Sequence, residues 1–109
     1  MRAETLKGHL DFLLLAILSD EPAHGYRIIE ELKRRSAGDF DLPEGTVYPA
    51  LHRLEQQGWL RAKTGQTDTG REAKFYALTP AGRKQLAREL ESWDRLSGAI
   101  GLIVRDGEA

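Results

Sequence analysis

The sequence of 109 residues predicts a mainly α-helical fold with one small β-hairpin, in the order three helices, two strands and a long last helix. Three observations support this order. Apolar side chains recur at helical spacing in three segments before residue 58, and two short strand-like runs flank a polar stretch at 65–71 that contains two glycines. Thr79-Pro80 is a typical helix start. The length suits one small domain.

The first helix is expected over residues 6–18, and apolar side chains occupy both of its sides. One face carries Leu10, Leu13, Leu14 and Ile17, and the other carries Phe12, Leu15 and Leu18. A helix that is apolar all round must be buried on both sides. Because one small domain is expected to cover only one side, we predict that a second subunit covers the other, with Leu10 and Leu14 at the interface.

The second helix is expected over residues 24–35. Its predicted buried side carries Tyr26, Ile28, Ile29 and Leu32, and its C-terminal end carries Lys33, Arg34 and Arg35, where the helix dipole favours cations. His24, at the start, is interpreted as a structural residue rather than a ligand, beside a glycine that permits close packing.

The third helix is expected over residues 45–57, with Gly58 as its C-cap. Pro49 is tolerated only in a first turn, so the helix should begin near residues 44–46. Val47, Leu51 and Leu54 share an inward face. The opposite side carries Gly45, Tyr48, Pro49, His52 and Gln56, with Arg53 beside them. Taken alone, such a stripe is more often a solvated helix face than a binding surface.

The two strands are expected over residues 59–64 and 73–78, with the hairpin tip between them. Three helices followed by a hairpin is the order of a winged helix-turn-helix, in which the third helix enters the major groove and the hairpin is the wing. In that setting Tyr48 and His52 would reach base edges, and Gly45 would let the helix N-terminus approach a phosphate. Arg53 and Gln56 would reach bases or phosphates. The other basic residues expected to meet the DNA backbone are Lys33, Arg34, Arg35, Arg61, Lys63, Arg71 and Lys74.

The last helix is expected over residues 79–105, as a C-terminal dimerisation helix. Leu86, Leu90, Trp93, Ser97, Ile100 and Val104 follow alternating spacings of four and three, and Leu96 and Ile103 widen this seam. Nothing else in so short a chain can cover the seam, so we predict a homodimer. Trp93 has two interpretations: a packing anchor, which we favour, or a sensor that stacks on a flat aromatic ligand. Residues 1–5 are expected to be a flexible N-terminus, residues 6–78 the DNA-binding domain and residues 106–109 a tail.

The overall net charge of −1 excludes a uniformly basic nucleic-acid binder, but the charge is unevenly distributed. Residues 43–88 contain eight basic and four acidic side chains, whereas the rest of the chain contains eight and thirteen. The predicted binding side is therefore basic and the remainder acidic. The chain has no cysteine, and its three histidines lie at unrelated spacings, so no metal, cofactor or catalytic set is predicted. The apolar run at 12–18 is too short to cross a membrane, and no signal peptide is recognisable, so a cytoplasmic protein is expected.

Residues 6–90 resemble the PadR family of bacterial transcriptional regulators. The resemblance is carried by the runs Leu13-Leu14-Leu15-Ala16-Ile17-Leu18, His24-Gly25-Tyr26, Gly45-Thr46-Val47-Tyr48-Pro49-Ala50-Leu51-His52-Arg53-Leu54-Glu55, Lys74-Phe75-Tyr76-Ala77-Leu78-Thr79 and Ala81-Gly82. It implies a homodimeric repressor that binds an inverted-repeat operator in double-stranded DNA. Some relatives release DNA on binding small aromatic compounds, so the resemblance leaves room for such an effector here. It also implies groove contacts from Gly45, Thr46, Tyr48 and Pro49, and a wing contact from Lys74.

A second hypothesis is a winged helix that docks a partner protein instead of DNA. The near-zero net charge leaves it open. Specific, salt-sensitive retardation of DNA would distinguish the two hypotheses, because phosphate contacts make DNA binding salt-dependent.

Overall fold

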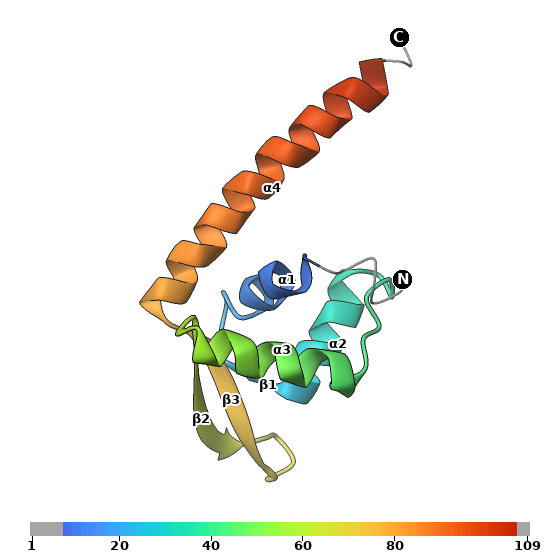
Figure 1. Cartoon of the computed structure of the whole chain (residues 1–109). Helices are drawn as coiled ribbons and strands as arrows, with labels where there is room; N and C mark the ends of the chain where they lie inside the picture. Colours follow the sequence, from blue (N-terminus) through green and yellow to red (C-terminus); the bar gives the residue numbers. More distant parts are fainter. Residues whose placement is uncertain (1–7, 107–109) are drawn as a thin grey trace.

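The computed structural model describes residues 8–106, which form four α-helices and one three-stranded antiparallel sheet (Figure 1). In chain order these are α1 (Leu10–Ile17), β1 (Ala23–His24), α2 (Gly25–Arg35), α3 (Glu44–Gln56), β2 (Leu60–Gln66), β3 (Glu72–Leu78) and α4 (Pro80–Asp106). The predicted fold class is confirmed, with one strand that was not predicted, β1. The expected helical residues 6 and 7, the expected flexible segment 1–5 and most of the expected tail lie outside the described residues.

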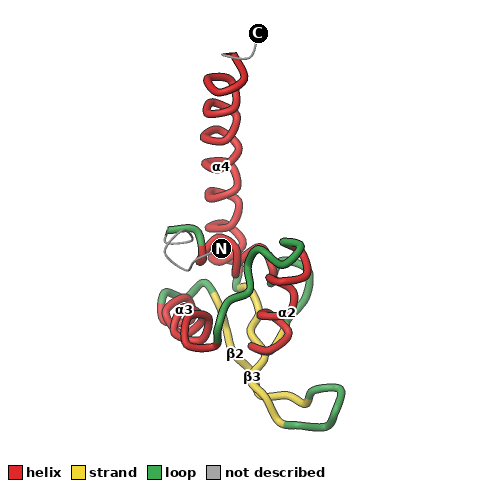
Figure 2. Tube along the Cα trace, turned by 90° about the vertical axis from the view of Figure 1, so that its right-hand side faces the viewer, coloured by secondary structure: helices red, strands yellow, loops and turns green. Residues whose placement is uncertain are grey.

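The sheet has the strand order β1-β3-β2, and its hairpin extends away from the helices (Figure 2). Strands β2 and β3 pair from Leu60 opposite Leu78 to Gln66 opposite Glu72, so they reach further towards the tip than predicted. The turn is correspondingly shorter, and its ends are joined by a hydrogen bond from the Thr67 amide to the Arg71 carbonyl, 2.8 Å. Strand β1 adds a second, two-residue pairing to β3.

The apolar core lies where α1, α2 and α3 meet the sheet. It consists of Leu14, Leu15, Ile17, Leu18, Ala23, Ile28, Leu32, Leu42, Val47, Ala50, Leu51, Leu54, Leu60, Tyr76 and Leu78. Leu14 on one side of α1 and Leu15 on the other are both completely enclosed within this one chain. Leu14 therefore cannot contribute to a dimer interface, and that part of the prediction is wrong, whereas Leu10 is only partly buried and its place at an interface stays a prediction. Helix α1 is surrounded because it lies against α2, α3 and α4 at once.

Helix α3 ends as predicted, but its proline is deeper than predicted. Gly58 adopts a φ of +82°, its amide donates to the Glu55 carbonyl, and the Trp59 amide donates to the Leu54 carbonyl, which is a Schellman end. The helix begins at Glu44, so Pro49 lies in the second turn and not in the first. Pro49 is exposed, and the hydrogen bond it cannot make, to the Gly45 carbonyl, lies near the helix start, where water can replace it.

Thr79 joins the end of α3 to the start of α4. Its hydroxyl donates to the Gly58 carbonyl at 2.6 Å and accepts from the Gly82 amide at 3.0 Å, which confirms the predicted helix start at Thr79-Pro80. A side chain at position 82 would overlap the carbonyl oxygen of Trp59, so glycine lets the first turn of α4 press against the chain leaving α3.

Helix α2 buries the predicted face except at Tyr26. Ile28 and Leu32 lie in the core and Ile29 is half-buried, but Tyr26 is 57% exposed. The prediction for Tyr26 is wrong because two residues correspond to about 200° around a helix, so Tyr26 points away when Ile28 points inward.

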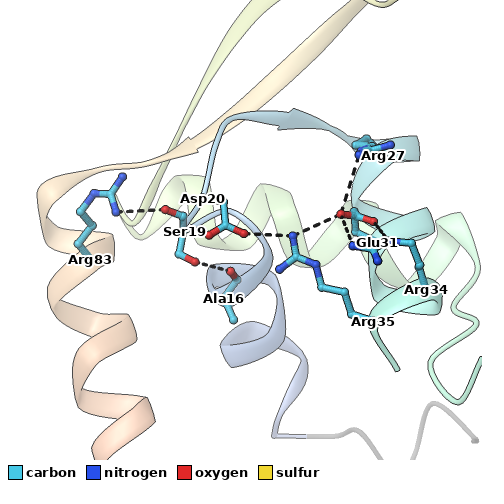
Figure 3. A network of polar contacts seen from close by, with 8 residues as sticks. All are labelled: Ala16, Ser19, Asp20, Arg27, Glu31, Arg34, Arg35 and Arg83. Atoms are coloured by element: carbon cyan, nitrogen blue, oxygen red, sulfur yellow. Dashed lines mark hydrogen bonds and ion pairs between the residues drawn. The ribbon is translucent and has the colours of Figure 1, made fainter. Parts of the chain in front are cut away.

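The buried side of α2 also contains a carboxylate, Glu31, which is 8% exposed (Figure 3). Arg34 donates to it from Nε at 2.6 Å, and Arg35 reaches it at 3.3 Å while also pairing with Asp20 at 3.2 Å. These hydrogen bonds, with that from Arg34 the strongest, hold the pKa of Glu31 at about 2, below its ordinary value of about 4.5. The cluster connects α2 to the turn after α1.

Helix α4 projects from the body, which we define as residues 10–78, and its free end lies opposite the hairpin tip (Figures 1 and 2). The molecule is therefore elongated, 56 × 29 × 22 Å. Of the predicted seam, only Leu86 and Ser97 are partly buried, whereas Leu90, Trp93, Ile100 and Val104 are exposed. Within residues 8–106, no helix combines the length and apolar character that crossing a bilayer requires.

Candidate nucleic-acid interface

Helix α3 presents two clearly different faces. Val47, Leu51 and Leu54 have no exposed surface, as predicted. The side chains on the opposite face are exposed at Pro49, His52 and Gln56, and a side chain at Gly45 would meet open space. The polar stripe of the sequence is therefore a real surface of the folded chain.

This surface continues into a hollow of about 370 Å³ between α3, the start of α2 and the hairpin. It is lined by His24, Gly25, Tyr26, Tyr48, His52, Thr67, Arg71, Glu72, Ala73, Lys74 and Tyr76. The fold thus brings together the predicted contact residues Tyr48, His52, Arg71 and Lys74, which come from α3, the tip and β3. Aromatic rings with polar ends, two cations and the Glu72 carboxylate surround this opening, so its net charge is positive.

Tyr48 is half-buried and folded into this hollow, with its hydroxyl over Gly25. Burial, and then the nearby Glu44 carboxylate, raise the pKa of the Tyr48 hydroxyl. Like any tyrosine hydroxyl, it carries its proton at neutral pH, so it can both donate and accept a hydrogen bond. These are the properties that contact with a base edge requires.

Tyr26 is a residue of the surface that sequence reasoning assigned to the core. The nearby Glu44 carboxylate, as a hydrogen-bond acceptor and as a negative charge, is the main cause of the raised pKa of the Tyr26 hydroxyl. The contact joins the first turn of α2 to the first turn of α3. Helical periodicity counted from Ile28 could have identified Tyr26 as exposed, because the two lie on opposite sides of α2.

The basic residues of the hairpin divide between its two faces. Cross-strand partners point to the same side, so Lys63 lies with Phe75 on the outer face, whereas Lys74 lies with Tyr76 on the face towards α3. Lys74 pairs with Glu55 at 3.8 Å, and its ammonium lies 5.8 Å from the Tyr76 ring centroid. Arg61, Lys63 and Arg71 make no ion pair with any other described residue.

The remaining predicted cations lie apart from the hollow and contact carboxylates of the chain. Lys33 pairs with Asp41 at 3.7 Å, Arg34 and Arg35 bind the Glu31 cluster, and Arg53 pairs with Asp11 of α1. The first three lie at the C-terminal end of α2, whereas the hollow is at its N-terminal end, about 12–15 Å away along the helix axis. The structure therefore does not bring Lys33, Arg34 and Arg35 together with Tyr48.

His24 has the structural role that the sequence indicated. Its Nδ1 accepts the amide hydrogen of Arg27 at 3.3 Å, which caps α2, and its ring meets Phe75 edge-on at 5.3 Å between centroids. The residue thus fixes the first turn of α2 against β3, beside the hollow.

A comparison with known families bears on what such a surface does. The sequence profile of the "Transcriptional regulator PadR-like family" matches residues 14–88, which include α2, α3 and the whole hairpin. The chain belongs to the PadR-like family. The resemblance noted in the sequence is thereby confirmed, and the chain is a DNA-binding transcriptional regulator and not an enzyme.

Individual PadR-like relatives agree with this assignment. Transcriptional regulator Rv3488 of Mycobacterium tuberculosis is 35% identical over 82 residues, which cover 75% of this chain and 73% of that protein. The negative transcriptional regulator PadR of Bacillus subtilis is 27% identical over 77 residues, which cover 71% of this chain and 42% of that protein. A PadR-like regulator of Bacillus cereus has a solved structure with a TM-score of 0.83 and 26% identity, over 94% of this chain and 97% of the other.

Proposed function

We propose that this PadR-like regulator is a homodimeric repressor that binds an inverted-repeat operator. The observation that carries the proposal is the common surface of α3 and the hairpin, where Tyr48, His52, Arg71 and Lys74 line one hollow. Two copies of α3 enter successive major grooves, and each wing lies along the flanking phosphates. Groove contacts come from Gly45, Thr46, Tyr48, Pro49 and His52, and backbone contacts from Lys63, Arg71 and Lys74. The B. subtilis relative is called a negative regulator, which supports repression.

The exposed side of α4 supports the dimer. Leu90, Trp93 and Ile100 are each about half exposed in the single chain, and they follow one another at heptad spacing. Contiguous apolar surface of this kind marks an interaction site. Leu10 and Leu86, partly buried against the core, border the same region. A second copy of α4 covers the seam, and the pair sets the distance between the two α3 helices.

We assign Trp93 the role of packing anchor in that interface. Its ring meets His9 edge-on at 6.1 Å between centroids, beside a hollow of about 160 Å³. In the single chain this hollow is smaller than the roughly 300–1,000 Å³ typical of small-molecule sites, so a sensor site would need a second subunit to complete it, whereas the anchor role needs only the exposed ring. Titration with planar aromatic compounds in a Trp59→Phe background tests this role. Saturable quenching of Trp93 together with release of DNA would establish the effector role instead.

Two measurements test the proposal as a whole. Light scattering after size exclusion should give twice the 12.2 kDa of one chain. A gel shift with the DNA upstream of the protein's own gene, at two salt concentrations, should show specific retardation with a steep salt slope. A monomer, or absence of retardation at low salt, would contradict the proposal.

Tyr48→Ala tests the recognition face. Because a good base contact contributes about 1–3 kcal/mol of discrimination, this variant should bind the retarded duplex roughly 5- to 150-fold more weakly and a scrambled duplex almost normally. Gln57→Ala, an exposed change at the C-cap of α3 and outside the predicted contact stripe, is the matched control. Unchanged affinity of Tyr48→Ala for the duplex would show that Tyr48 does not contact bases.

A further inference from the structure

Gly25 is the first residue of α2 and is buried in the hollow. A Cβ atom built there would lie no more than 2.5 Å from three atoms of the Tyr48 side chain: Oη, Cζ and Cε1. Gly25 is not among the glycines with positive φ, so its backbone conformation is open to any residue. The reason for glycine at this position is therefore the space that the Tyr48 ring occupies.

The kind of atom that approaches Gly25 distinguishes it from other glycines of the chain. At Gly82, a side chain would collide with the backbone oxygen of Trp59, which cannot move without shifting the chain. At Gly25, the collision is with the outer end of a side chain, which can rotate towards solvent because Tyr48 is only half-buried. Alanine at position 25 should thus leave the fold intact and displace the ring.

We propose that Gly25 is a positioning residue for DNA recognition, because its missing side chain forms the seat that fixes the Tyr48 ring and hydroxyl at the edge of the hollow. The inference rests on the proposed role of Tyr48 in reading the operator. A ring already held in one orientation loses less side-chain entropy on binding, so its contact with a base contributes more affinity. The backbone at Gly25 is itself held in place, because the preceding residue, His24, caps α2 and packs its ring against Phe75.

A double-mutant cycle tests the proposal. The wild type, Gly25→Ala, Tyr48→Ala and the double variant are titrated, by fluorescence anisotropy, against the shortest upstream duplex that the gel shift retards and against a scrambled duplex. Gly25→Ala should weaken binding to the retarded duplex about tenfold and leave the scrambled duplex unaffected. In the Tyr48→Ala background, Gly25→Ala should have no further effect, since the group that it displaces is gone.

Two results would overturn the proposal. One is normal affinity of a folded Gly25→Ala variant while Tyr48→Ala is impaired. The other is equal weakening by Gly25→Ala in both backgrounds, which would mean that position 25 acts through α2 and not through the tyrosine. If Tyr48→Ala itself binds the retarded duplex normally, the proposed base contact of Tyr48 is wrong. That result differs from failure of the Gly25 proposal alone, in which Tyr48→Ala is impaired and Gly25→Ala is not.

The wild-type protein provides a further test that depends on no variant. Nuclear Overhauser effects between the Tyr48 ring protons and the Gly25 Hα protons should be strong in the DNA-free protein. Absence of these effects would mean that the Tyr48 ring does not lie over Gly25 and would overturn the proposal. The melting temperature of Gly25→Ala should equal that of the wild type or exceed it slightly, because alanine is the better helix former.

Discussion

The body buries its apolar side chains, whereas most apolar side chains of helix α4 are exposed to solvent. In the body, residues such as Leu14, Leu51 and Tyr76 are enclosed by other parts of the same chain. In the 27-residue helix α4, by contrast, Ile100 is 49% exposed and Ile103 is 78% exposed. Among the residues that the structure describes, none packs against the outer half of α4 (Figure 1).

The difference separates two sources of stability. The free energy of folding of the body comes from contacts within one chain, whereas that of the outer half of α4 depends on what covers its seam. If the cover is a second copy, that part of the stability depends on protein concentration. Four predictions, in order of expected size, test this division.

The largest effect is expected in the body. Leu51→Ala removes a completely buried side chain and should lower the free energy of unfolding by about 2–5 kcal/mol, measured by urea denaturation. Leu102→Ala, at a residue that is 76% exposed, is the control and should change it by less than about 0.5 kcal/mol. Equal losses from the two variants would contradict the division.

The next effect concerns the seam of α4. Ile100→Asp places a charge in the proposed dimer contact and should raise the dimer dissociation constant on the order of a hundredfold, measured by analytical ultracentrifugation. Leu102→Asp introduces the same charge about 200° around the helix, outside the seam, and should leave the dimer intact. A dimer that tolerates Ile100→Asp would mean that another surface joins the subunits.

A smaller effect is expected at the wing, and it should leave the dimer unchanged. Lys63→Ala should reduce the slope of log affinity against log salt by about 1, because one phosphate contact is lost. Lys74→Ala should reduce it less, since Glu55 already balances part of that charge. If the two slopes fall equally, Lys74 leaves Glu55 when DNA binds.

The smallest effect is expected at the Glu31 cluster and depends on pH. Because the folded-state pKa of Glu31, about 2, lies below its ordinary value of about 4.5, its ionised form stabilises the fold above pH 4.5 and loses that effect as the pH falls towards 2. Glu31→Gln should therefore lower the melting temperature at pH 7, and its difference from the wild type should shrink between pH 5 and pH 2. Glu30→Gln, exposed on the same helix, is the control. A difference that stays constant with pH would contradict the ionic role.

The sequence by itself determined the features that depend on near neighbours in the chain. The inward face of α3, its end at Gly58 and the start of α4 at Thr79 were predicted because periodicity, caps and turns involve residues a few positions apart. The seam of α4 was predicted for the same reason. The family runs, which are also local, then indicated DNA binding.

Only the tertiary structure decided which distant residues meet. Strand β1 is two residues long and exists because β3 lies beside it, so no periodicity could reveal it. The enclosure of Leu14, the pairing of Arg53 with Asp11, and the opposite faces of Lys63 and Lys74 likewise depend on packing and strand register. The position of Tyr48 over Gly25 joins two residues that are 23 positions apart in the sequence and lie on different helices. Such contacts follow from the way the whole chain packs around one core, a property that no short segment contains.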